Sequence, residues 1–373
     1  MKKQLLIIVN EDSFFLSHRT RIAEMAKEKG WGVIIVAKDT GKASDIRNRG
    51  LDFIPLPINP TGLNLWQELK LLRFLIQLFK KNQDSIVHLV GLKNILWGGL
   101  ASKLKGVKGK VFAVSGLGTL FGENQSSLLS SCVKKMLKFS MKGGNNAVIF
   151  QNHEDEDLFL SNGIGSECKS YYLKGSGVDL NNYSNNIKSK DSKVRIIYTG
   201  RMIKEKGVKD LIDAAEILRG EYQDKIEFLL CGNLTNHPDS IKEEEIKSWC
   251  DEEYIKWLGH REDIARLLEE SDIMCYPSYY REGVPKSILE ACAASLPIVT
   301  TNSVGCKDTV DESVNGLLVP PHSPEELSKA LKELIDNKEL REEMGRNSRL
   351  KAVLEFDVED VAFQHMKIYE SLS

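Results

Sequence analysis

The stretch VRIIYTGRMIKEKGV, residues 194–208, passes from a strand-like segment through a glycine into basic residues. The segment 194–199 is rich in β-branched and aromatic residues, which favours a strand, and Gly200 permits a close backbone approach. Arg201 and Lys206 stand before a segment with helical spacing, where amide groups and the helix dipole favour anions. The stretch therefore predicts one unit of a parallel α/β sheet with a diphosphate site. Solvated surface charge is the alternative for the two basic residues.

The same alternation of strand-like and helical segments extends in both directions, which is typical of βαβ units and parallel sheets. The asparagine-, serine- and lysine-rich segment 178–193 separates two series of expected strands. These strands are residues 4–10, 32–38, 85–91, 109–116 and 146–152 in the first series, and 194–200, 226–232, 255–259, 273–278, 297–301 and 316–320 in the second. We expect two Rossmann-like domains, residues 1–180 and 181–353, and a helix over 354–373 that crosses back to the first domain.

Composition and charge restrict the functional class. The 373 residues are 42% hydrophobic, and no apolar run has the length of a membrane span or a signal peptide, so we expect a cytoplasmic protein. The seven cysteines form no C-x-x-C pair, which argues against a zinc site or a disulfide framework. Residues 1–180 carry 25 basic and 16 acidic residues, whereas residues 181–373 carry 26 and 37. The first half is therefore basic and the second acidic.

A second stretch, REGVPKSILEA at residues 281–291, directly follows the expected strand 273–278. Gly283 allows a turn and Pro285 suits the first turn of a helix, so the amides of residues 284–287 are expected to form a further phosphate cradle. Glu282 and Glu290 lie eight residues apart, and we expect each carboxylate to accept hydrogen bonds from a different sugar. The alternative is a Glu282 that stabilises the helix dipole and a solvated Glu290.

Together with PIVTT at 297–301 and NGLLV at 315–319, these stretches resemble the family 4 glycosyltransferases. The resemblance is close over residues 170–335 and loose over residues 1–150. It implies the GT-B fold, with two Rossmann-like domains facing a cleft. By this resemblance Arg201 and Lys206 bind the donor diphosphate, Glu282 binds the donor sugar, and Glu290 binds the nucleotide ribose. Further donor contacts are expected from Gly200, Gly283, Val284, Pro285 and Lys286.

The first domain departs from the family pattern, because IIVNEDSFFLSHRTRIAE replaces the usual glycine-rich turn after the first strand. The residues expected on the acceptor side are Asn10, Ser13, His18, Arg19, Ser115 and Gly116. Ser115 and Gly116 occupy the region where relatives commonly carry a histidine. His88, in the expected strand 85–91, is our candidate for a catalytic histidine, and a hydrogen-bonded core histidine is its alternative.

The resemblance implies retaining, metal-independent transfer of a sugar from a nucleotide-sugar donor, which we expect to be UDP-linked. Because Arg201, Lys206 and helix amides can stabilise the leaving diphosphate, no metal cofactor is expected. The expected acceptor is a glycan, in particular a lipid-diphosphate-linked saccharide of surface polysaccharide synthesis. The alternatives are a non-catalytic nucleotide-sugar-binding scaffold and a GT-B sugar-nucleotide epimerase.

Basic clusters in the first domain predict contact with an anionic membrane, at the inner face of the plasma membrane. These clusters are Lys103, Lys105, Lys108 and Lys110, and Lys134, Lys135 and Lys138. A solvated face that serves only solubility is the alternative. Nucleic-acid binding is not expected, because aromatic residues are not interleaved with the basic clusters.

Two other motifs suggest competing functions. Gly116, Gly118 and Gly122 lack the spacing and the later acidic residue of a dinucleotide fingerprint, which argues against a nicotinamide dehydrogenase. Asp155 and Asp157 form an Asp-x-Asp pair that could hold a metal, but a helix start capped by Asn152 is the simpler interpretation.

Overall fold

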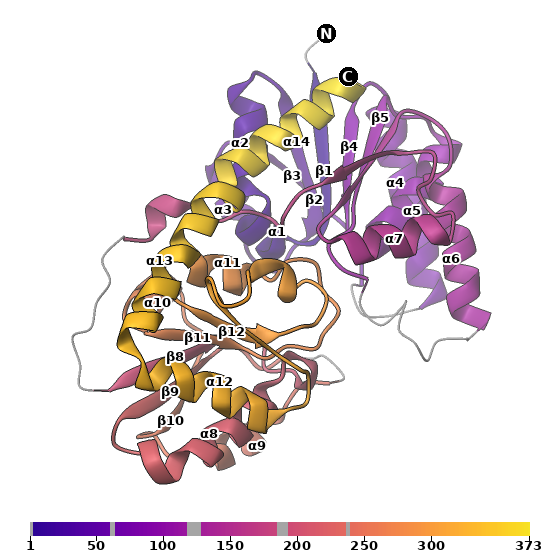
Figure 1. The fold of residues 1–373 in the computed structure, drawn as a ribbon. Coiled ribbons are helices and arrows are strands. Elements are labelled where there is room, and N and C mark those ends of the chain that lie inside the picture. Colours follow the sequence, from indigo (N-terminus) through magenta and orange to yellow (C-terminus); the bar gives the residue numbers. More distant parts are fainter. Residues whose placement is uncertain (1–2, 60–63, 118–127, 185–192, 236–238) are drawn as a thin grey trace. The chain divides into compact units, whose positions relative to one another are not determined.

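The computed structural model describes residues 3–59, 64–117, 128–184, 193–235 and 239–373. The chain divides into two compact units (Figure 1). Unit 1 consists of residues 1–176 together with 358–373, and unit 2 consists of residues 177–357. Each unit is built around its own parallel sheet.

Unit 1 contains a seven-stranded sheet in the order β3-β2-β1-β4-β5-β6-β7. Its strands are β1 (Gln4–Glu11), β2 (Gly32–Lys38), β3 (Asp52–Pro55), β4 (Ile86–Val90), β5 (Gly109–Ala113), β6 (Asn146–Phe150) and β7 (Lys169–Tyr172). β4, β5 and β6 are buried along their whole length, as expected for strands covered by helices on both faces. The strand order reverses direction between β1 and β4, and such a switch point is where parallel sheets usually bind ligands.

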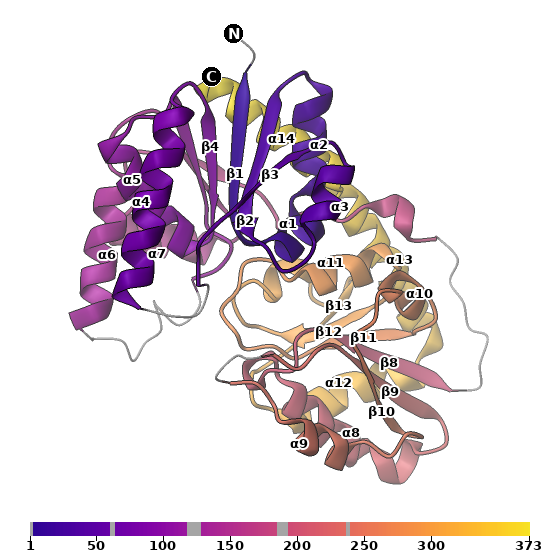
Figure 2. The ribbon, with the colours of Figure 1, turned by 180° about the vertical axis from the view of Figure 1, so that it is seen from behind.

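Two helical layers cover this sheet (Figure 2). One layer consists of α4 (Leu65–Lys81), α5 (Leu92–Leu104), α6 (Leu128–Met141) and α7 (His153–Ser161), and the other of α1 (Asp12–His18), α2 (Thr20–Glu28), α3 (Ala43–Asn48) and α14 (Val358–Leu372). Alternate residues of β1 point into the two cores: Leu5 and Ile7 lie in one, Leu6 and Ile8 in the other. The last helix of the chain, α14, packs beside α2 although more than 300 residues separate them.

Unit 2 contains a six-stranded sheet in the order β10-β9-β8-β11-β12-β13, with its switch point between β8 and β11. Its strands are β8 (Val194–Thr199), β9 (Ile226–Cys231), β10 (Ile255–Gly259), β11 (Ile273–Tyr276), β12 (Ile298–Thr301) and β13 (Gly316–Val319). Its helices are α8 (Val208–Tyr222), α9 (Glu243–Trp249), α10 (Ile264–Glu269), α11 (Lys286–Ala293), α12 (Pro324–Asp336) and α13 (Lys338–Glu355). α8 packs with α12, and α11 packs with α13.

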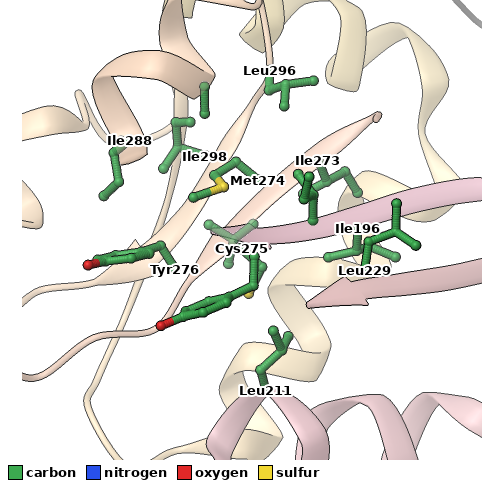
Figure 3. Close-up of a cluster of buried hydrophobic side chains, with 14 of the residues drawn as sticks. Ile196, Leu211, Leu229, Ile273, Met274, Cys275, Tyr276, Ile288, Leu296 and Ile298 are labelled. Atoms are coloured by element: carbon green, nitrogen blue, oxygen red, sulfur yellow. The ribbon is translucent and has the colours of Figure 1, made fainter. Parts of the chain in front are cut away.

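The central strand β11 runs through the core of unit 2 (Figure 3). Met274 and Cys275 are fully buried there, in one cluster with Ile288 of α11 and Ile298 of β12. Tyr276 ends the strand with 2% of its surface exposed. Packing in the core therefore fixes the position of the Tyr276 side chain, and with it that of its hydroxyl, at the end of β11.

The predicted α/β architecture with two parallel sheets is confirmed. Two further strands were not predicted from the sequence: β3 and β7, which have four residues each and form the two edges of the first sheet. Within the described part of the chain, no helix has the length and apolar character needed to span a bilayer.

Candidate active site

The carboxyl ends of β8 and β9 are brought together by glycine. A Cβ added to Gly232, which follows β9, would lie 1.7 Å from the carbonyl oxygen of Gly200, which follows β8. At Gly207, where φ is +72°, a Cβ would lie 2.0 Å from the carbonyl oxygen of Pro277 beyond β11. Only glycine permits these approaches, so the loops that follow three adjacent strands are in direct backbone contact.

A network of four polar side chains crosses the switch point between β8 and β11. Lys206 Nζ donates to Glu282 Oε1 at 2.5 Å and to Tyr276 Oη at 2.5 Å. Tyr276 Oη donates to the same carboxylate oxygen at 3.2 Å, and Ser278 Oγ donates to it at 3.3 Å. Glu282 therefore accepts three hydrogen bonds on one oxygen.

Burial and charge fix the protonation state of Tyr276 in this network. Burial and the neighbouring Glu282 carboxylate raise the pKa of the Tyr276 phenol well above its ordinary value. The phenol therefore stays protonated and serves as a donor to Glu282. Lys206 also lies 5.0 Å from the centre of the Tyr276 ring and 5.5 Å from that of Tyr280, close enough for cation–π attraction. The Lys206 side chain is 6% exposed and the Glu282 side chain 17%.

The Glu282 loop is held from two sides. Gly305 has a φ of +85°, and a Cβ there would lie 1.7 Å from the carbonyl oxygen of Gly283. Asp308 Oδ2 accepts a hydrogen bond from the Gly305 amide at 3.0 Å, which anchors this second loop. Thr301 at the end of β12 donates to the carbonyl of Ser278. These contacts fix the loop between β11 and α11.

α11 begins directly after Pro285, which occupies its N-cap position. Gly283, Val284 and Pro285 are buried, whereas Lys286 is partly exposed. The amino end of a helix favours negative charge, and here it immediately follows the Glu282 loop. This local geometry agrees with the turn and helix start expected from REGVPKSILEA.

Glu290 lies one helical turn after Lys286 on α11, and its Oε1 is 3.6 Å from Lys286 Nζ. Desolvation raises the pKa of the Glu290 carboxyl, and the attraction of Lys286 opposes this shift. Its side chain is 22% exposed, so it can still reach a ligand. Arg201, in contrast, is exposed, and its carbonyl accepts a hydrogen bond from Tyr198 at 3.2 Å.

Two residues predicted in unit 1 are in its core. His88 has no exposed surface, and its Nδ1 is 2.6 Å from Tyr369 Oη. A catalytic His88 is therefore corrected to a hydrogen-bonded core histidine, because β4 is central and helices cover both faces. Arg19 is 2% exposed, and this burial also removes it from the acceptor-side residues.

The other acceptor-side candidates of unit 1 keep some exposure. Asn10, at the end of β1, accepts a hydrogen bond from Asn94 of α5 at 2.8 Å, across the switch point of the first sheet. The His18 ring stacks on Phe14 at 4.3 Å. Ser13 is exposed, and Ser115 and Gly116 are partly exposed. Contact of these residues with an acceptor stays a prediction, as do the donor-side roles in unit 2.

Three polar residues that the sequence analysis did not select have structural roles here. Tyr276 and Ser278 belong to the expected strand segment 273–278, and polar residues at the end of a strand beside a switch point were the available signal. Asp12 is fully buried and accepts hydrogen bonds from the amides of Thr40 and Lys42, which ties β1 to the loop after β2. Burial alone would raise the pKa of Asp12, but these hydrogen bonds and that of the Thr40 hydroxyl hold it below its ordinary value.

The helix-start interpretation of Asp155 and Asp157 is confirmed. The Asn152 side chain accepts a hydrogen bond from the Asp155 amide at 2.7 Å and caps α7. Asp155 is fully buried while Asp157 is exposed, so the two carboxylates do not face one ligand. The described residues contain no group of three or more histidine, cysteine or acidic side chains arranged to hold a metal. Gly118 and Gly122 lie outside the described residues.

Two family models match the chain. The one described as glycosyl transferases group 1 matches residues 180–351, and the one described as glycosyl transferase 4-like matches residues 4–152. These matches place similarity to glycosyltransferases in both units.

Two bacterial relatives match nearly the whole chain. One is the N,N'-diacetylbacillosaminyl-diphospho-undecaprenol alpha-1,3-N-acetylgalactosaminyltransferase of Campylobacter jejuni, 26% identical over 378 residues, with 95% of this chain and 97% of the relative covered. The other is the UDP-Gal:alpha-D-GlcNAc-diphosphoundecaprenol alpha-1,3-galactosyltransferase of Escherichia coli, 25% identical over 348 residues, with coverage of 90% and 88%.

A solved structure shares the fold. Anabaena HepE in complex with UDP is 20% identical, with a TM-score of 0.79 and 100% of both chains covered. Its complex with UDP-glucose gives 19% identity, a TM-score of 0.78 and 99% coverage of both chains. At this identity the likeness is one of fold.

Proposed function

We propose that this chain, which belongs to the family 4 glycosyltransferases and has their GT-B fold, transfers a sugar from a UDP-sugar to a lipid-diphosphate-linked saccharide. The observation that carries the donor half is the Lys206–Glu282 pair, held by Tyr276 and Ser278 at the switch point of the second sheet. The relatives from Campylobacter and Escherichia, whose names describe diphospho-undecaprenol acceptors, support the acceptor half.

In this proposal the basic groups of unit 2 bind the donor diphosphate. Lys206 brings a nearly buried ammonium group, which interacts strongly with a phosphate because little water screens it. Exposed Arg201 supplies a guanidinium whose planar fork suits bidentate contact with phosphate oxygens. The UDP complexes of the Anabaena neighbour support a uridine diphosphate.

The two glutamates bind the two sugars of the donor. Glu282 Oε1 is occupied by Lys206, Tyr276 and Ser278, which orients the carboxylate toward the donor sugar. Glu290 accepts hydrogen bonds from the ribose hydroxyls, as the resemblance implies, and Lys286 holds it in place. A carboxylate has enough lone pairs to accept two hydroxyl donors at once. The two carboxylates therefore recognise hydroxyl groups of the donor, and neither glutamate is a nucleophile.

The proposed transfer retains anomeric configuration and needs no divalent metal. Breaking the bond between sugar and diphosphate places negative charge on the leaving oxygen, and Lys206, Arg201 and the amino end of α11 stabilise it. The acceptor hydroxyl attacks the face from which the diphosphate departs and gives its proton to a phosphate oxygen. Transition-state stabilisation by this chain is then electrostatic.

We place the membrane-facing surface on α4, α5 and α6. Their sequences contain nine basic residues and one acidic residue, Glu68, which is buried and paired with Lys93 at 2.6 Å. At the start of α4, Leu65 and Trp66 are 69% and 81% exposed. A basic, carboxylate-poor helical layer with an exposed tryptophan suits the anionic bilayer that carries a lipid-linked acceptor.

The basic surface differs from the one expected in the sequence analysis. Lys110 is buried, and its ammonium group lies 3.2 Å from Ser102 Oγ, so it does not contribute. Desolvation lowers the pKa of this ammonium to about 8. Of the other predicted lysines, Lys103, Lys108, Lys135 and Lys138 are exposed, and Lys105 and Lys134 are partly exposed.

The deciding experiment incubates the purified protein with a panel of UDP-sugars and an undecaprenyl-diphosphate-linked N-acetylhexosamine, with and without EDTA. We expect one donor to be consumed, the product to keep the anomeric configuration by NMR, and EDTA to leave the rate unchanged. Glu282→Ala serves as the inactive control. An inverted product, a rate that requires Mg²⁺ or Mn²⁺, or donor binding without transfer to any lipid-linked saccharide contradicts the proposal.

A further inference from the structure

A cluster of basic and aromatic side chains is sealed inside unit 1. It consists of Arg19, at the junction of α1 and α2, His88 on β4, and His365 and Tyr369 on α14. None of the four has more than 2% of its surface exposed. We call it the Arg19 cluster. It lies in the apolar core between the sheet and the α2–α14 layer of unit 1, whereas the residues proposed to bind the donor belong to unit 2.

The hydrogen bonds within the cluster leave several atoms unsatisfied. Tyr369 Oη lies 2.6 Å from His88 Nδ1, and His365 Nδ1 donates to the Val361 carbonyl at 2.8 Å. Among the described residues, no partner is found for four fully buried nitrogens: Arg19 Nε, Arg19 Nη1, His88 Nε2 and His365 Nε2. Buried polar atoms in proteins are rarely unsatisfied, so several together call for a water molecule or an ion as their partner.

The three rings of the cluster are close neighbours. The rings of His88 and His365 are 5.5 Å apart, and that of Tyr369 lies 5.7 Å from His88 and 6.2 Å from His365. The Arg19 charge is near enough to act on both imidazoles: burial lowers the pKa of His88 and of His365, and Arg19 lowers both further. The imidazoles are therefore neutral at neutral pH.

Arg19 supplies a positive charge that no described carboxylate balances. A guanidinium stays protonated in proteins, and burying it without a counter-charge costs several kcal/mol or more. Burial lowers the pKa of Arg19 to about 10, which still leaves it charged at neutral pH. A neutral water molecule would satisfy the hydrogen bonds but not the charge.

We propose that the Arg19 cluster binds a small monovalent anion, such as chloride, inside unit 1. Arg19 offers two N–H donors, and His88 Nε2 carries a proton when the Tyr369 hydroxyl donates to Nδ1. The neutral His365 ring donates its one proton from Nδ1 to the Val361 carbonyl, so its Nε2 gives no hydrogen bond to the anion. The cluster is surrounded by buried apolar side chains, which offer no further donors for the several oxygens of a carboxylate or a phosphate, and this favours a single-atom ion.

The first test measures thermal unfolding of the full chain after exchange into sodium gluconate, while chloride replaces gluconate at constant ionic strength. Once chloride exceeds its dissociation constant, the melting temperature of wild-type unit 1, which has 192 residues, should rise by about 3–6 °C for each tenfold increase. Bromide should act similarly. Arg19→Met should remove the dependence, while Arg73→Met, the same change at an exposed arginine on α4, should keep it. A wild-type melting temperature that does not respond to chloride overturns the proposal.

The second test needs no variant, in case Arg19→Met does not fold. Crystals of the wild type grown in sodium bromide should show an anomalous peak between the Arg19 guanidinium and His88 Nε2. Electron density at this position without anomalous signal would identify a water molecule and reject the anion.

Discussion

Lys206 Nζ and Glu282 Oε1 lie 2.5 Å apart, although 76 residues separate them along the chain. One residue follows β8 and the other follows β11, so the pair spans the switch point of the second sheet. Because both side chains are largely buried, each charge depends on the other for its compensation.

Removing one member of this pair should destabilise the protein more than removing both. We expect Glu282→Gln or Lys206→Met alone to lower the free energy of unfolding by about 2–4 kcal/mol, somewhat less than for a fully buried pair because Glu282 is 17% exposed. Lys206→Met/Glu282→Gln should recover at least half of the combined loss. Urea unfolding measures this, and single-variant losses that simply add would contradict the coupling. All three variants should lose at least about 99% of transfer activity.

Glu290→Gln should weaken UDP binding without unfolding the protein. The amide replaces one acceptor oxygen with a donor, so we expect the dissociation constant to rise about tenfold, equivalent to about 1.4 kcal/mol. Isothermal titration calorimetry checks this, and Glu333→Gln on the exposed face of α12 is the matched control. Equal affinities of the wild type and Glu290→Gln would remove the ribose assignment.

Gly305→Ala tests the packing of the Glu282 loop. The added Cβ would lie 1.7 Å from the Gly283 carbonyl at a φ of +85°, so we expect a loss of more than about 2 kcal/mol in unfolding free energy. Gly220→Ala is the control, because Gly220 lies in α8 with no heavy atom within 4 Å of the added Cβ. It should stabilise the protein by about 0.5–1 kcal/mol. Comparable effects of the two substitutions would mean that the loop can shift.

The buried histidines should make unit 1 sensitive to acid. Burial lowers the pKa of His365 from 6.5 to about 3, so the unfolded chain binds a proton more readily than the folded one. The contribution of neutral His365 to the free energy of unfolding is therefore fully present above pH 6.5 and is lost as the pH drops toward 3. At pH 5 the loss is about 2 kcal/mol for this residue. Urea unfolding in halide-free buffer at pH 7.5 and pH 5 should show the loss. It should shrink in His365→Gln but not in His153→Gln, where the histidine is exposed.

The helical layer of α4, α5 and α6 should bind anionic vesicles in a salt-sensitive way. We expect Lys135→Glu/Lys138→Glu to weaken binding to phosphatidylglycerol vesicles at least tenfold, since each basic residue near such a surface contributes about 1 kcal/mol. Trp66→Ser should weaken the binding that remains at high salt. Lys329→Glu/Lys338→Glu makes the same charge change in unit 2 and should have little effect. If all variants bound the vesicles equally, this surface would be a solvated face without a role in membrane binding.

The fold was predictable from the sequence to the extent that strands are buried. All eleven expected strands are present, because Val- and Ile-rich runs mark strands covered on both faces. β3 and β7 are edge strands of four residues, partly exposed, and their sequences DFIP and KSYY lack that pattern. The division of acceptor and donor binding between residues 1–180 and 181–353 stays a prediction.

The site was only partly predictable. Glycine and proline marked the loops after β8 and β11, and the roles of Lys206 and Glu282 were expected from their place in these loops and from the resemblance to the family 4 glycosyltransferases. That these two residues contact each other follows from strand order, which local sequence does not contain. The prediction for His88 was wrong because the sequence of a strand does not show whether its histidine is buried in the core or reaches a ligand at the end of the strand. Its partner Tyr369 lies 281 residues away.

The return of α14 to unit 1 constrains how the protein folds during synthesis. Residues 1–176 lack one helix of their core, including Tyr369 and His365, until the ribosome has translated all of unit 2. At about 5–20 residues per second, the intervening 181 residues (177–357) delay this helix by about 10–40 s. During this interval the apolar surface that α14 later covers is exposed on the nascent chain. Unit 2 consists of one continuous segment of chain, so it can complete its fold before unit 1 does, although most of unit 1 is synthesised first.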